Sequence, residues 1–438
     1  MAPKRKPDGD GVGESTDEFA KPLDDTMEFA KPVYLVAVRE DDQAAYSILK
    51  IDAAAGNDEP PRVRAVAVLT TGTERGMSFV TAHSKHGSWI VGVGGGLRAG
   101  TIIFDPSTLK TFQGPRLGYP KHKPVLISHG SEVYAISGTP RVKPSMDCEP
   151  WFEYLSFKEG VPYKECGRWV SWHHLPPPPF FPCLLDPYEF RNPPEISVSS
   201  YAVVDSHILI SPQPELAVGT YAFHVVNKVW EKVHDKNLPF LGQAVPLGGS
   251  LFAAWPISAA STSAASVFHM SIKISSSIPV APVTVSTPSL SIQEFMLVAS
   301  EDKIPWPLFC PMGKGSFCCI RLTPSRRWHS HKIKYLNKEV KVLSTAFRIK
   351  NIEAIMTHCQ SQRGKAKDQL LAVQMKEQRH KCESNGLLGL LGSGMPVIAA
   401  LSMDTQNIEL RDETIGTIGA SGATKSIILE APVIPTGR

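Results

Sequence analysis

The stretch Gly87-Ser-Trp-Ile-Val-Gly-Val93 decides the fold, because a turn-forming pair leads directly into an apolar run. The same phrase, Gly-Ser or Asp-Ser followed by an apolar run, returns at Gly130–Ile136, Asp205–Ile210, Gly249–Ala254 and Gly315–Ile320. Tyr34–Val38 is a further copy without the turn. Glycine suits such turns because it adopts positive φ without steric cost. The recurrence predicts a protein built from repeated β units.

A second β phrase that contains an aromatic residue follows each copy. These phrases are Tyr46–Leu49, Thr101–Phe104, Phe152–Leu155, Tyr221–His224, Val267–Met270 and Ala346–Ile349. In two units a third phrase combines Trp with a later Leu-Pro, at Trp172–Pro176 and Trp230–Pro239. Each unit is then a small antiparallel meander that cannot bury both faces alone. Stacking the units around an axis buries those faces against each other.

The spacing of the units, about 40–50 residues, suits a kelch-type propeller blade. We therefore expect an all-β fold, a kelch-like β-propeller with six blades that start near residues 33, 86, 129, 204, 248 and 313. The alternative is a pair of β-sandwiches, since short strands at regular spacing fit that architecture too. Longer spacings predict three long loops, Pro140–Trp151, Pro176–Pro194 and Ser258–Ser291. In the second of these, Pro176–Pro179 would form a polyproline II segment that can itself be a ligand.

The chain is expected to have three parts. Residues 1–32 read as a disordered leader in which Lys4-Arg5-Lys6 is a weak import-like signal. Residues 33–403 form the propeller, and residues 404–438 an irregular tail. Proline supplies 37 of the 438 residues, which disfavours a mostly helical protein.

One apolar stretch, Gly386–Met403, carries no charge and approaches the length of a membrane helix. A Leu- and Gly-rich loop followed by a buried strand, Val397–Ser402, explains it as well, and we expect no membrane partner. The eight cysteines form no CxxC pair, and the N-terminus has no apolar signal segment. We therefore expect a cytoplasmic or nuclear monomer with reduced thiols.

Several motifs suggest chemistry, but none has the full pattern. Gly94–Ala99 matches a dinucleotide-binding pattern, yet a β-branched strand follows where a helix is required. His173 and His174 are adjacent on a predicted strand and therefore point to opposite faces. Cys318 and Cys319 lie within an apolar strand phrase, where free cysteine is usually buried. We expect no metal, no cofactor and no catalytic residue.

Four motifs together, Met1–Lys6, Gly87–Gly96, Ile103–Thr108 and Gly313–Cys318, resemble a plant family of unknown function with kelch-like repeats, expanded in grasses. The resemblance covers about residues 1–380 and implies a propeller scaffold without an assigned activity. Plant kelch proteins often follow an F-box, for which residues 1–32 are too short and too polar.

Charge is concentrated in residues 321–350, which contain nine Lys and Arg against one acid, Glu339. Bases alternate there with aromatic residues, which suits phosphate contact and stacking, although lysines on a solvated edge strand are the simpler explanation. The candidate partner-binding residues are Arg326, Arg327, Trp328, Lys332, Lys334 and Tyr335.

Three functions remain open from the sequence. The first is a non-enzymatic scaffold whose loops bind an unidentified protein. The second is binding of nucleic acid or another polyanion through residues 321–350. The third is an enzyme with a site at the channel mouth, using His173, His174 or His207 as a base.

Overall fold

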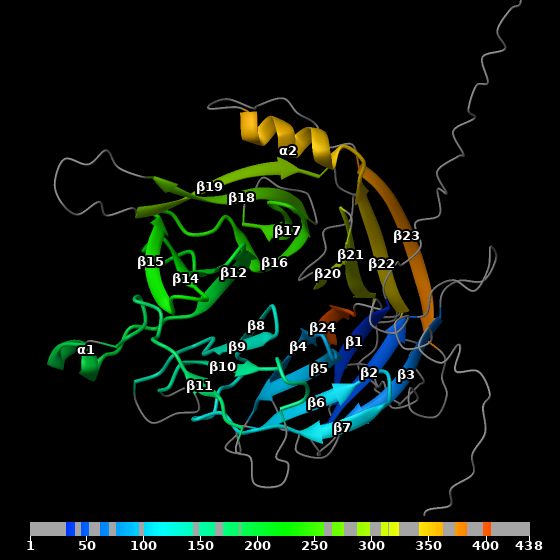
Figure 1. Ribbon diagram of the computed structural model, residues 1–438, viewed down its shortest axis with the longest axis horizontal. Helices are drawn as coiled ribbons and strands as arrows, with labels where there is room; N and C mark the ends of the chain where they lie inside the picture. The colour runs from blue at the N-terminus through cyan, green and yellow to red at the C-terminus, as the bar shows by residue number, and fades with distance from the viewer. Residues whose placement is uncertain are drawn as a thin grey trace, which may run out of the picture.

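The computed structural model of the chain is almost entirely β-structure (Figure 1). The residues that the structure describes are 32–39, 45–51, 62–69, 76–95, 100–142, 149–162, 170–183, 185–257, 265–275, 287–297, 308–313, 315–323, 341–361, 373–382 and 397–403. Two short helices, α1 (Pro187–Arg191) and α2 (Ile352–Ser361), occur within them.

The strands form six four-stranded antiparallel units within these residues. From the inner strand outward, unit 1 contains β24 (Val397–Ser402), β1 (Val33–Arg39), β2 (Ala45–Ile51) and β3 (Arg62–Leu69). Unit 2 contains β4 (Met77–Ser84), β5 (Gly87–Gly94), β6 (Thr101–Asp105) and β7 (Lys110–Gln113). Unit 3 contains β8 (Val125–His129), β9 (Glu132–Ile136), β10 (Phe152–Ser156) and β11 (His173–His174).

The other three units follow the same order. Unit 4 contains β12 (Val198–Val204), β13 (His207–Pro212), β14 (Thr220–His224) and β15 (Val229–His234). Unit 5 contains β16 (Phe240–Gly248), β17 (Leu251–Pro256), β18 (Ser266–Ser275) and β19 (Thr287–Met296). Unit 6 contains β20 (Leu308–Gly313), β21 (Ser316–Thr323), β22 (Lys341–Ile349) and β23 (Val373–Cys382).

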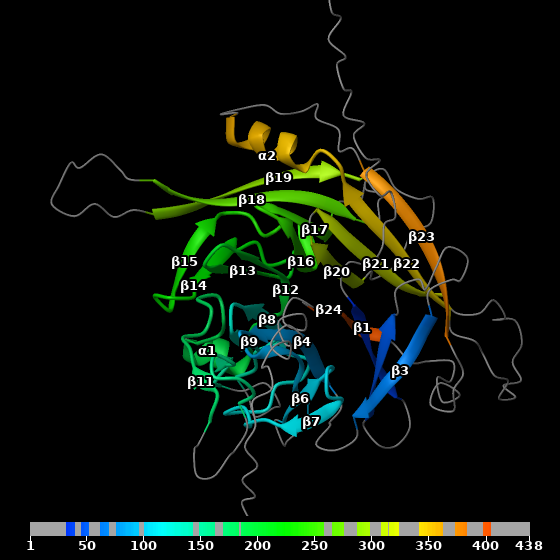
Figure 2. The same ribbon diagram turned by 45° about the vertical axis from the view of Figure 1, so that its right-hand side comes forward.

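The units close into a ring, as Figures 1 and 2 show from two directions. Each inner strand contacts the inner strand of the next unit, from β24 through β4, β8, β12, β16 and β20 back to β24. Short parallel pairings, β12 with β16 and β23 with β3, join two pairs of units into eight-stranded sheets. The expected all-β propeller is confirmed, and the sandwich pair is excluded because the ring is closed.

The C-terminal strand β24 closes this ring. It pairs antiparallel with β1, with Val33 opposite Ser402 and Tyr34 opposite Leu401. The expected strand at Val397–Ser402 is therefore confirmed. Unit 1 combines three N-terminal strands with one strand from near the other end of the chain, so the ring depends on a contact between distant parts of the sequence.

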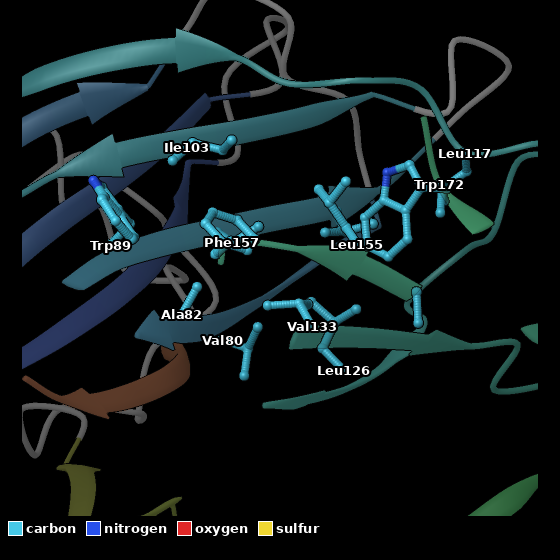
Figure 3. Packing of buried hydrophobic residues seen from close by; sticks show 13 residues of the cluster. Val80, Ala82, Trp89, Ile103, Leu117, Leu126, Val133, Leu155, Phe157 and Trp172 are labelled. Carbon is cyan, nitrogen blue, oxygen red and sulfur yellow. The ribbon is translucent and has the colours of Figure 1, made fainter. Parts of the chain in front are cut away.

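Six hydrophobic clusters fill the space between neighbouring units. The cluster between units 2 and 3 is drawn in Figure 3, where Trp89 stacks on Phe157 with ring centroids 5.6 Å apart. Trp172 is buried in the same cluster and donates its indole N–H to Thr101 Oγ1 at 3.1 Å. Because both faces of each unit are covered, the second strands are apolar at consecutive positions as well as at alternate ones.

The repeated phrases correspond to the second and third strands of each unit. Two-residue turns such as Gly130-Ser131, Asp205-Ser206 and Gly249-Ser250 join the first strand to the second. The first residue of each of these turns has positive φ, as two-residue hairpins require. The expected blade starts near 86, 129, 204, 248 and 313 are thus wrong by one strand. The first strands lack a turn phrase before them and so escaped the pattern.

The strand order defines two ends of the ring. The turn end carries the connections from first to second and from third to fourth strands. The loop end carries the connections from second to third strands and from each unit to the next. The described residues of the expected loops Pro140–Trp151 and Pro176–Pro194 lie at the loop end. The expected single loop Ser258–Ser291 is wrong, because β18 and the start of β19 run through it.

Candidate interaction surface

The connection from unit 3 to unit 4, residues 175–197, is held firmly against the ring at the loop end. Trp230 donates its indole N–H to the carbonyl of Pro176 at 2.8 Å. Phe181 is buried and packs edge-on against Trp151, with ring centroids 5.9 Å apart. Pro178 is also buried, whereas Pro176 and Pro179 are exposed, so the proline run is only partly packed on the protein.

Helix α1 extends from this anchored connection into solvent and was not expected from the sequence. Its start is fixed by a capping box, in which the Asp186 carboxylate accepts from the N–H groups of Tyr188 and Glu189, both at 2.8 Å. In turn, the Glu189 carboxylate accepts a hydrogen bond from the backbone N–H of Asp186 at 3.1 Å. The sequence Asp-Pro-Tyr-Glu is the local pattern that could have predicted it.

No residue of α1 is buried, and its two aromatic side chains are left in solvent. Tyr188 is 73% exposed and Phe190 is 54% exposed. Ordinary surface helices turn such side chains inward, because burying an aromatic residue is worth about 2 kcal/mol or more. The anchored connection with its exposed aromatic pair is therefore the strongest candidate for an interaction surface in the described residues.

The candidate residues of the basic segment, Arg326, Arg327, Trp328, Lys332, Lys334 and Tyr335, lie outside the described residues. The strands on either side are placed: β21 ends at Thr323, which is paired with Lys341 at the start of β22. This connection joins a second to a third strand, so both strand ends belong to the loop end. Arg321 and Arg348 lie on β21 and β22 themselves.

The histidines considered as bases do not form one site. His173 packs against Tyr154, with ring centroids 4.9 Å apart, whereas His174 lies 3.6 Å from the Glu153 carboxylate. They occupy opposite faces of β11, as expected. His207 is in unit 4 at the turn end, where its ring packs edge-on against His224 with centroids 4.7 Å apart. In the placed part of the chain, no group of three His, Cys, Asp or Glu side chains has the geometry to hold a metal.

The two thiols of Cys310 and Cys318 face each other across β20 and β21 and are buried, as is Cys319. Burial raises the pKa of the Cys318 thiol well above its usual value, and the neighbouring Cys310 and Cys319 add to the effect. A thiol that stays protonated is a poor nucleophile. The expectation that these cysteines pack as small hydrophobic residues agrees with their positions. Cys148 and Cys166 lie outside the described segments.

The His207 pair predicts how stability depends on pH. Burial and the neighbouring His224 lower the pKa of His207, although Glu231 and Asp205 act in the opposite direction. Among the described residues His207 Nδ1 has no hydrogen-bond partner, and His224 Nδ1 accepts the N–H groups of Val226 and Asn227. A lowered folded-state pKa means that the unfolded chain binds more protons. The contribution of His207 to the free energy of unfolding is therefore fully present above the unfolded pKa of 6.5, and it is lost as the pH falls below that value.

Urea denaturation between pH 7.5 and pH 5, interpreted by this linkage, measures the effect. We expect His207→Gln to flatten the decline, and His86→Gln, a change on an exposed turn, to leave it unaltered. Equal slopes for the parent and H207Q would contradict the assignment.

A buried ion pair was missed by the sequence analysis. Lys121, in the connection from unit 2 to unit 3, donates to the carboxylate of Glu153 on β10, and both side chains are 0% exposed. Lys121 and Glu153 are 32 positions apart, and the β phrase that contains Glu153 gives no sign that its side chain pairs with Lys121. Only the folded ring brings them together.

The closed ring of antiparallel four-stranded units makes this protein a β-propeller. The chain belongs to the family described as "Protein of unknown function (DUF1668)", whose model matches residues 30–382. The resemblance to a family of unknown function is confirmed, whereas kelch-like repeats and a plant origin stay predictions. The match ends with β23, so the closing strand β24 lies beyond it.

Three solved structures are similar to the chain. They are YjhT (TM-score 0.34, 10% identity, 73% of this chain and 96% of that one), the β-propeller domain of Cps50 (Swd1) from Myceliophteria thermophila (0.32, 10%, 70% and 82%) and the WD40 domain of SCAP from fission yeast (0.30, 7%, 81% and 88%). No curated protein matches the sequence at a significant level. Neither described helix has the length and apolar character needed to span a membrane.

Proposed function

We propose that the protein is a non-enzymatic interaction scaffold that binds a partner protein through the loop end of its propeller. In this proposal it acts as a monomer in the cytoplasm or the nucleus, where unpaired thiols stay reduced. The observation that carries the proposal is α1, a short capped helix with Tyr188 and Phe190 in solvent on an anchored connection.

Two physical arguments support this role. Aromatic side chains are enriched at protein interfaces and supply much of the binding free energy there. A surface that is already ordered loses little conformational entropy when it binds. The capping box and the packing of Phe181 hold α1 in place before any partner arrives.

The test replaces both aromatic residues in the full chain, Tyr188→Ala with Phe190→Ala. Partner proteins captured by the parent and identified by mass spectrometry should be lost or bound at least about tenfold more weakly by this variant, since interface aromatics contribute roughly 2 kcal/mol or more. The stability in urea should change little, because neither side chain is buried.

The matched control removes two exposed aliphatic side chains at the turn end, Val226→Ala with Ile274→Ala, which are 73% and 69% exposed. The control should keep the captured partners. If the Y188A/F190A variant keeps every partner, or if both variants lose the same ones, the loop end is not the binding surface.

We include the basic segment, residues 321–350, in the same proposal as a second binding region, because the strands on either side of it end at the loop end. In the same capture experiment we expect neutralisation to remove a subset of partners and to weaken the dependence of binding on salt. The variant changes four residues, Arg326→Gln, Arg327→Gln, Lys332→Gln and Lys334→Gln. Unchanged capture at low salt would reduce the segment to a solvated face.

A further inference from the structure

We infer that the connection from unit 2 to unit 3, residues 114–124, is a preformed docking loop for an acidic segment of a partner protein. We call these residues the basic loop. The inference rests on the proposed function, because the basic loop lies at the same end of the ring as α1. It adds the chemical class of the partner and the residues that would recognise it.

The exposed side chains of the basic loop include two cations, Arg116 and Lys123, the imidazole of His122 and one aromatic ring. Arg116, His122 and Lys123 are exposed, and Tyr119 is 40% exposed between them. The sequence from Gly114 to Pro124 contains no acid. Within the described residues, Glu153 is the acid to which this loop is hydrogen-bonded, and it is fully buried with Lys121. The solvent side of the loop is therefore cationic.

The backbone of the basic loop is fixed at successive points along its length. Gly114 N–H donates to the Thr101 carbonyl at 2.9 Å, and the Trp172 indole donates to the Pro115 carbonyl at 3.2 Å. Gly118 N–H donates to Glu153 Oε1 at 2.7 Å. Beyond it, the Lys121 carbonyl accepts the Gly95 N–H at 3.0 Å, and Lys123 N–H donates to the Gly76 carbonyl at 2.6 Å.

Side chains add to this order. Leu117 is buried in the cluster between units 2 and 3, and Pro115, Pro120 and Pro124 each restrict φ. Lys121 reaches inward to Glu153 and to the Tyr119 carbonyl, the latter at 3.4 Å. A buried ion pair adds little net stability, because desolvation offsets the attraction. It does fix the conformation of the loop, and that conformation turns Arg116, Tyr119, His122 and Lys123 outward.

A short acidic peptide segment fits this surface better than a nucleic acid does. Nucleic acids are bound through an extended row of bases that follows the phosphate backbone. Here the neighbouring connection, residues 175–197, has three acids, Asp186, Glu189 and Glu195, against one base, Arg191. A long polyanion would meet that negative charge next to the positive loop. A local acidic segment meets only the basic loop, and Tyr119 offers an apolar contact beside the charges.

The test measures binding of a fluorescein-labelled peptide of repeated Glu-Asp-Leu to the full chain by fluorescence anisotropy. The triple variant Arg116→Gln, His122→Gln, Lys123→Gln should weaken binding about tenfold, and Tyr119→Ala should weaken it further in combination. The matched control is Lys85→Gln, His86→Gln, Lys158→Gln, three exposed bases at the turn end. The control should bind within about twofold of the parent, because its three bases lie at the other end of the ring. It changes the net charge by a similar amount, so a difference between the two variants reports on the position of the charges.

Competition separates the partner classes. A single-stranded DNA of the same net charge as the peptide should compete less well than the unlabelled peptide. Stronger competition by the DNA would overturn the inference, as would equal loss of binding in the triple variant and its control. If these fail while the Y188A/F190A variant still loses its protein partners, the partner class is wrong and the scaffold proposal stands. If both experiments fail, then neither the basic loop nor the aromatic pair on α1 is a binding surface.

Discussion

A chain that ends at Pro396 is expected to lose its cooperative fold, whereas a chain that ends at Met403 is expected to keep it. The difference between the two is β24, which supplies the inner strand of unit 1 through five register pairs with β1. Its removal leaves β1 as an unpaired edge facing the channel and opens the ring between units 6 and 2. An open hydrophobic edge of this kind also favours aggregation.

The size of the effect follows from what β24 contributes. Ala399 and Met403 are buried in the cluster between units 1 and 2, and Ala400 packs into the cluster between units 6 and 1. The backbone hydrogen bonds to β1 and the burial of Met403 make the largest contributions. At about 1 kcal/mol per hydrogen bond and roughly 2–3 kcal/mol for Met403, the loss is about 5–10 kcal/mol. That is comparable to the whole stability of a typical domain, about 5–15 kcal/mol.

Circular dichroism and urea denaturation of the two truncated chains measure this difference. The chain that ends at Met403 serves as the control, because it keeps β24 and removes only residues 404–438. A cooperative transition in the shorter chain with an unchanged midpoint would contradict the closure of the ring by β24.

Replacing Glu153 with Leu is expected to destabilise the protein by about 3–5 kcal/mol, because it leaves the buried Lys121 ammonium without its carboxylate. The same change removes the acceptor of the Gly118 N–H. Both side chains of the pair are fully buried, so water cannot replace the lost partner. The double variant Lys121→Met, Glu153→Leu should recover most of the loss, since an apolar pair of similar volume needs no partner.

A double-mutant cycle in urea, with Lys121→Met as the second single variant, measures the coupling between the two residues. Additive effects, with the double variant no more stable than E153L, would contradict a specific pair. The double variant also tests the role of the pair at the surface. It should bind the acidic peptide more weakly than the parent at equal stability, because the basic loop has lost the anchor at Gly118.

The local elements could be read from the sequence because their causes are local. Turn pairs such as Gly130-Ser131 and Asp205-Ser206 adopt positive φ and are followed by apolar runs, so the second and third strands were predicted in every unit. Helix α1 was missed although its capping box is equally local, because the surrounding prolines indicated an extended loop. The residues proposed for the basic segment, such as Arg326 and Lys332, remain predictions.

The sequence by itself determined the β units and the all-β propeller class, since these follow from turn chemistry and from the alternation and length of apolar runs. Only the tertiary structure decided that β24, from near the end of the chain, shares unit 1 with the N-terminal strands β1, β2 and β3. It also brought Lys121 to Glu153 and left Tyr188 and Phe190 in solvent. The physical reason is that these features depend on contacts between residues far apart in the chain. A contact such as β24 with β1 exists only once all six units have closed the ring.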